Sequence, residues 1–132
     1  MQALSTLPNF ILYLLSAWAF LLLFVLIYIR LTPFPEVKLI RAGNHAAATA
    51  FIGALIGYVL PLSSAIAHST ALSDMAIWAL IGLLVQYLAH LITRLLIPTL
   101  NYDIHNNNQA MGTISAGFSV VFGLLNAACM VY

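Results

Sequence analysis

Four long stretches of the chain are dominated by apolar side chains, and short polar connections separate them. The apolar stretches cover residues 7–29, 44–67, 74–97 and 108–130, and charges occur in them only near the ends of the third. An α-helix rises about 1.5 Å per residue, so each stretch is long enough to cross a hydrocarbon layer of about 30 Å. The pattern predicts an all-α, polytopic membrane protein with four transmembrane helices.

The connections and their immediate edges carry all three acidic residues and three of the five prolines. Two prolines and two charges within 32–38 predict a loop, and the polar cluster at 101–107 predicts a turn. Ser73 is predicted to be the N-terminal cap of the third span, and Asp74 an acidic residue of its first turn. Because the acidic residues Glu36, Asp74 and Asp103 all fall in or beside connections, we expect no buried carboxylate.

Composition supports the membrane assignment and excludes several classes of function. Hydrophobic residues make up 64% of the 132 residues and charged residues only 5%, against about a quarter in a soluble domain. A net charge of +1 without a basic cluster excludes a nucleic-acid partner, so the expected surroundings are the lipid bilayer. The single cysteine, Cys129, and the absence of a nucleophile or metal-binding motif predict no catalytic, cofactor or metal site, so we do not expect an enzyme.

The basic residues are distributed unequally among the connections. All four lie in or beside the first and third: Arg30, Lys38, Arg41 and Arg94. The positive-inside rule places these two connections in the cytoplasm, and the second connection and both termini outside. Aromatic residues near the span ends, Tyr28 among them, are expected to anchor at the membrane interface.

The two halves of the chain match when the sequence is shifted by 64 residues. The polar and glycine positions that coincide are Arg30 with Arg94, Asn44 with Asn108, Thr49 with Thr113, and Gly53 with Gly117. Each half contains two spans and therefore inserts with the same orientation. We predict two tandem, parallel two-helix repeats at 1–66 and 67–132.

The starts of the second and fourth spans carry a family resemblance. Residues 44–48 read Asn-His-Ala-Ala-Ala and residues 108–112 read Asn-Gln-Ala-Met-Gly, and each precedes a helix with two glycines, at 53 and 57 and at 117 and 123. The whole chain resembles the YjfL-like inner-membrane family, also called UPF0719 or the domain-of-unknown-function-350 family. This resemblance implies a bacterial inner-membrane protein built from two-helix repeats, without an established activity, and with a membrane-associated protein partner for some members. In such a membrane, the distribution of basic residues places both termini on the periplasmic side.

Small residues follow one face of the second span and one face of the fourth. The small-residue face of the second span is Ala46, Ala50, Gly53 and Gly57; that of the fourth is Gly112, Ala116, Ser119 and Gly123, with Asn126 continuing the spacing. Such faces let helix backbones approach closely, and Asn126 is placed to hydrogen-bond across a helix interface. The contact can lie within one subunit or between subunits, and we expect the two faces to serve different contacts.

Polar residues also form a stripe on the third span and begin two helices. The polar stripe is Gln86, His90 and Arg94, spaced i, i+4 and i+8 on one helical face. It either lines a hydrophilic path or makes hydrogen bonds between helices while Arg94 reaches the headgroups. Asn44 and Asn108 are expected to cap the second and fourth spans.

Two functions follow from these features. The leading interpretation is a structural or interaction subunit that assembles with itself, with a membrane-associated partner protein, or with both. The alternative is a small oligomeric channel or transporter whose path is lined by the polar stripe. The two differ in whether Gln86 and His90 are hydrated.

Overall fold

The computed structural model describes residues 2–33 and 35–130, and its regular elements there are six helices. Four are long: α1 (Gln2–Leu31), α3 (His45–His68), α4 (Leu72–Leu96) and α6 (Gln109–Cys129). Two are short: α2 (Glu36–Arg41) and α5 (Leu100–His105). All four long helices are apolar and long enough to span a membrane, which confirms the predicted all-α architecture with four spans.

The predicted loop and turn are wrong in detail, because each contains a short helix. Pro35 occupies the position before α2, where proline's missing N–H costs no helical hydrogen bond. In α5, the Thr99 hydroxyl donates to the Asp103 carboxylate at 2.9 Å across the first turn. The cap predicted at Ser73 is also wrong, because α4 begins at Leu72. Asp74 lies in the first turn of α4, as predicted, and its carboxylate accepts a long 3.4 Å bond from the Thr70 N–H.

Each short helix leads into the next long helix with the same backbone geometry. Gly43 and Asn107 have positive φ angles of 90° and 60°, a region that glycine and asparagine tolerate best. The following asparagines begin α3 and α6, and their side chains accept from the N–H of the third residue along. The chain therefore turns into the next long helix in the same way at two equivalent places, 64 residues apart.

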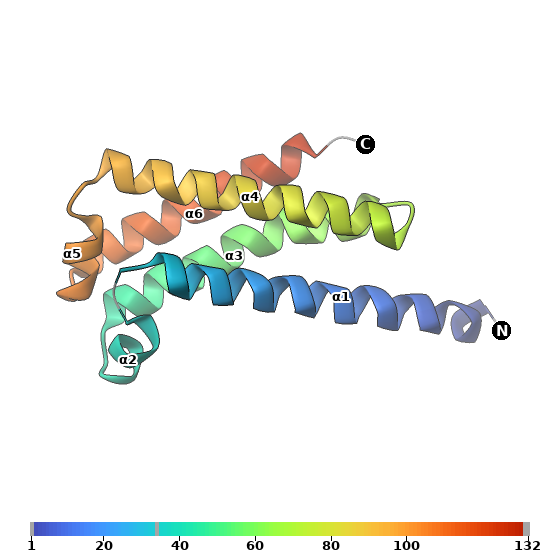
Figure 1. Cartoon of the computed structure of the whole chain (residues 1–132), viewed down its shortest axis with the longest axis horizontal. Coiled ribbons are helices and arrows are strands. Elements are labelled where there is room, and N and C mark those ends of the chain that lie inside the picture. Colours follow the sequence, from blue (N-terminus) through green and yellow to red (C-terminus); the bar gives the residue numbers. More distant parts are fainter. Residues whose placement is uncertain (1, 34, 131–132) are drawn as a thin grey trace.

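The long helices run alongside one another, and the short helices lie together at one end of the molecule (Figure 1). The opposite end holds the α3–α4 turn, the start of α1 and the end of α6. Helices α3 and α6 make the most extensive contact, and α4 packs against both. Because all four basic residues lie at or near α2 or at the end of α4, the short-helix end carries the basic charge.

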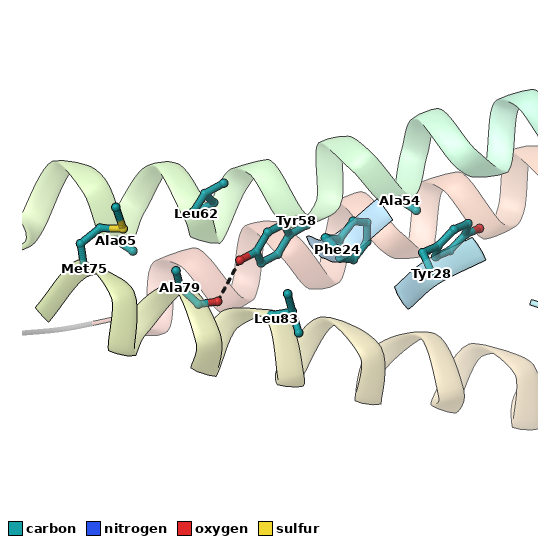
Figure 2. Packing of buried hydrophobic residues seen from close by; sticks show 9 residues of the cluster. All are labelled: Phe24, Tyr28, Ala54, Tyr58, Leu62, Ala65, Met75, Ala79 and Leu83. Carbon is teal, nitrogen blue, oxygen red and sulfur yellow. Dashed lines mark hydrogen bonds between the residues drawn. The ribbon is translucent and has the colours of Figure 1, made fainter. Parts of the chain in front are cut away.

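The apolar core lies between α1, α3 and α4. Phe24 and Tyr28 of α1 extend into this core (Figure 2). The Phe24 ring stacks on the Tyr58 ring of α3 at a centroid distance of 4.8 Å. The Tyr58 hydroxyl donates to the Ala79 carbonyl of α4 at 2.9 Å. Buried hydroxyl groups require such partners, so this bond fixes α3 against α4 without breaking the core.

Candidate functional site

The two small-residue faces lie against each other inside the subunit. An added Cβ at Gly53 would meet the Ala116 backbone, and one at Gly112 would meet the Ala46 backbone. The expectation that the two faces serve different contacts is therefore wrong. Residues without large side chains on both helices bring the α3 and α6 backbones into direct contact, which bulkier residues would prevent.

Gly57 and Gly123 meet at the closest point of this contact. Pro61 has no N–H to donate to the Gly57 carbonyl, which lies one helical turn earlier. The backbone at Gly123 packs on this same carbonyl, which leaves no space for a Cβ at Gly123. A weak Cα–H···O contact is the interaction that such an approach permits.

The polar stripe of α4 is packed against neighbouring helices. Gln86 is buried, and its amide Nε2 donates to the Ser119 carbonyl of α6 at 2.9 Å. The His90 ring lies 5.3 Å from the Tyr28 ring of α1. Arg94 donates through its guanidinium to the Leu31 carbonyl, at 3.0 Å, near the end of α1.

The space enclosed beside this stripe is very small. Gln86, His90 and Ser119 line it together with aromatic residues of α1 and α4, and its cavity volume is about 10 Å³. A volume of about 10–15 Å³ is the lower limit for a single water molecule. Gln86 and Arg94 therefore join helices through hydrogen bonds, and the enclosed space is too small for a continuous aqueous path. His90 and Arg94 also line an open groove of about 370 Å³, whose other lining side chains are four leucines and Tyr87.

Asn126 and Asn44 both make hydrogen bonds between helices. The Asn126 amide donates to the Gly82 carbonyl of α4 at 3.1 Å. Asn44 caps α3 by accepting from the Ala47 N–H, and its amide also donates to the carbonyls of Ile104 and His105, at 3.0 and 3.2 Å. Asn108 caps α6 but is exposed, so the two predicted caps differ in what they hold together.

Glu36 contradicts the expectation that every carboxylate lies exposed in a connection. Its side chain is only 1% exposed, because α2 folds back onto the helices and turns its first residue inward. Neither carboxyl oxygen has a hydrogen-bond partner. Tyr28 and Arg94 are the polar groups that act on the carboxyl: the Tyr28 hydroxyl lies near it without reaching hydrogen-bond geometry, and Arg94 acts through its charge.

Burial dominates the ionisation of this carboxyl. Removal from water raises the pKa of Glu36 to about 8, although the Tyr28 hydroxyl and the Arg94 charge both act to lower it. An unpaired charge in an apolar site is unfavourable, and the nearby groups compensate only in part. Burial therefore favours the protonated form of Glu36 around neutral pH.

Sequence reasoning does not identify Glu36 or Tyr28 as members of a site. Tyr28 is expected at the membrane interface, yet it is 2% exposed and belongs to the core. The 64-residue shift pairs Glu36 with Leu100, a buried apolar residue at the start of α5. That pairing is the signal in the sequence that position 36 faces inward.

Metal-binding side chains do not converge in the part of the structure that is described. Across residues 2–33 and 35–130, no group of three or more histidine, cysteine, aspartate or glutamate side chains lies close enough to hold a metal ion. Cys129 is exposed on α6. The chemistry that the arrangement offers is therefore hydrogen bonding between helices and protonation of one buried carboxyl.

Comparison with known proteins gives a consistent family relationship. Residues 2–130 match the family described as Domain of Unknown Function (DUF350). The chain is 38% identical to the UPF0719 inner membrane protein YjfL of Escherichia coli (strain K12), over all of both chains. It is 29% identical to the UPF0719 transmembrane protein YshE of Bacillus subtilis (strain 168), over 82% of each chain. No solved structure matches the chain.

Proposed function

The chain belongs to the DUF350 family, and on that premise we propose that it is a multi-pass protein of the bacterial inner membrane that acts as a structural or interaction subunit and assembles with itself. The observation that carries this proposal is the closed polar stripe. Gln86 and Arg94 are engaged by backbone carbonyls of α6 and α1. Polar groups used in this way hold membrane helices together. The proposed role involves no catalysis.

Solvent-exposed apolar surface on the long helices supports self-assembly. Residues 6–12 of α1 are all exposed, and Phe10 is 60% exposed. A second apolar surface is a groove of about 370 Å³ between α4 and α6, with Trp78 and Met130 among its lining residues. Lipid can cover such surfaces, but a neighbouring copy fills a groove with better-fitting side chains.

We expect the purified protein in lipid nanodiscs to contain more than one copy. Native mass spectrometry of the particle gives the stoichiometry directly. A Trp78→Ala variant removes a side chain from the α4–α6 groove and is expected to lower the proportion of oligomer. The matched control is Trp18→Ala, because Trp18 is an exposed tryptophan on α1 that does not line this groove. A strictly monomeric wild-type particle would remove self-assembly from the proposal.

Two further features of the proposal concern topology and duplication. The basic short-helix end is assigned to the cytoplasm, which places both termini and the α3–α4 turn in the periplasm. The two halves are assigned to one ancestral two-helix unit. Helix α5 starts and stops 64 residues after α2, and the asparagine caps that follow the two helices are also 64 residues apart. This equal spacing supports a common origin.

Cysteine labelling tests the closed stripe and the topology together. In a Cys129→Ala background, we expect cysteines at Gln86 and His90 to resist a charged, membrane-impermeant thiol reagent, because Gln86 is buried against α6 and the groove beside half-buried His90 is lined mainly by leucine side chains. A cysteine at Thr70, in the exposed α3–α4 turn, should react in intact cells. A cysteine at Tyr102, 71% exposed in α5, should react only after the cells are opened.

The labelling pattern separates the alternatives. Reaction at both Gln86 and His90 would support a hydrated path and the channel or transporter interpretation. Reaction of Tyr102, but not Thr70, in intact cells would reverse the proposed topology without affecting the closed stripe. The two exposed positions also show that the reagent reaches the protein.

A further inference from the structure

A completely buried carboxyl without a partner is the chemically least expected feature of the structure. Glu36 is 1% exposed, and both oxygens lack hydrogen-bond partners. A buried carboxylate is normally paired with a cation or with several donors, because burial removes its hydration. A protonated carboxyl carries no charge, so it fits this environment far better than the ionised form.

The fold itself does not require an acidic residue at this position. Leu100 stands at the equivalent first position of α5 and is also 1% exposed. A short helix of this kind therefore docks through an apolar residue in the second half of the chain. The use of glutamate in the first half adds a titratable group to a site that leucine would serve structurally.

The charged and titratable groups around Glu36 come from several helices. Tyr28 of α1 and Arg94 of α4 interact with the carboxyl. Behind Tyr28, the His90 ring of α4 lies at a ring-centroid distance of 5.3 Å. On α3, His45 is exposed at the start of the helix. The basic residues of α2 itself, Lys38 and Arg41, are exposed.

An open groove runs beside the buried carboxyl. Its volume is about 430 Å³, and Glu36 lines it with Ile29 of α1 and with Val37 and Lys38 of α2. The groove is lined by the end of α1 and by α2 and its preceding proline, so it lies at the basic, short-helix end of the molecule. Because Glu36 lines this open groove, an outward movement of α2 would expose the carboxyl to water.

From this geometry we propose that Glu36 is a reversible proton-binding site that controls the docking of α2. With α2 docked, one carboxyl oxygen carries a proton taken from the adjoining water. Loss of this proton to water leaves a buried carboxylate, which is relieved when α2 moves outward and becomes hydrated. The ligand is the proton, and the moving element is the short helix between the first two spans.

The direction of the pH dependence follows from the two states of Glu36. Its pKa is raised from 4.5 when the group is hydrated to about 8 when α2 is docked. Docking is therefore most favourable at pH below 4.5 and weakens as pH rises towards 8. Across that interval one proton is taken up on docking, so the docking equilibrium changes by about tenfold per pH unit.

Infrared spectroscopy of the protein in nanodiscs tests the proton site. We expect a protonated-carboxyl C=O band at neutral pH that disappears as the pH rises through about 8. The Glu36→Gln variant should lack this band, and Asp103→Asn, which removes a carboxylate from the equivalent connection, should retain it. Absence of a carboxyl that titrates above about pH 6 in the wild-type protein would overturn the proposal.

Hydrogen exchange tests the coupling to α2, with α5 as an internal reference. The ratio of α2 to α5 exchange rates should rise as pH increases through Glu36 ionisation, since intrinsic pH effects cancel in the ratio. In Glu36→Leu, which introduces the side chain found at the equivalent Leu100, this ratio should stay constant. A constant ratio in the wild type would overturn the control of docking. Neither test depends on stoichiometry, so failure here leaves the self-assembly proposal standing.

Discussion

Replacing Gly123 by alanine is expected to destabilise the protein by about 3 kcal/mol, the upper part of the range for overpacked cores. The added methyl group would occupy the position of the Gly57 carbonyl in α3. Backbone atoms cannot rotate away as a side chain can, so α3 and α6 must separate. Separation reduces the contact along the whole small-residue face.

Gly117 provides the matched control for this substitution on the same helix. A Cβ added there meets nothing within 4 Å, so Gly117→Ala should change the free energy of unfolding by less than about 1 kcal/mol. The measurement is reversible unfolding in mixed micelles, followed by circular dichroism. Equal losses for Gly123→Ala and Gly117→Ala would contradict the close α3–α6 contact.

Replacing Asn44 by alanine is expected to cost about 2–3 kcal/mol, whereas Asn108→Ala should cost about 1 kcal/mol. Both substitutions remove a helix cap. Only Asn44 also bridges to the second half, through its bonds to the carbonyls of Ile104 and His105. Its loss leaves buried carbonyl groups without that donor.

A serine at position 44 separates the two roles of Asn44. Serine retains an oxygen that accepts from the Ala47 N–H, but it has no amide to reach Ile104 or His105. We expect Asn44→Ser to recover about 1 kcal/mol of the loss seen with alanine. Full recovery of the free energy of unfolding would mean that the cross-connection hydrogen bonds contribute nothing.

The four spans could be predicted because their causes are local. Lipid favours any uncharged apolar helix of sufficient length, whatever it packs against, so the sequence pattern alone identifies it. The asparagine caps are equally local, because the side chain bonds to the backbone three residues away. The short helices escape prediction because prolines and polar residues mark both loops and helix starts.

The polar stripe shows what helical periodicity can predict and what it cannot. Spacing places Gln86, His90 and Arg94 on one face of α4, and the structure has α4 as a continuous helix over all three. Periodicity does not say what covers that face. Here the Ser119 carbonyl and the end of α1 cover it, which depends on the separation and tilt of three helices.

By itself, the sequence determined an all-helical membrane protein with four spans, capped helix starts and two faces of small residues. These properties depend on neighbours within a few residues and on the energetic cost of placing charges in lipid. Only the tertiary structure decided that the two small-residue faces meet, that Asn44 bridges the halves and that Glu36 is buried. Burial of a connection residue depends on where its short helix folds back, and that is set by contacts between residues distant in the chain.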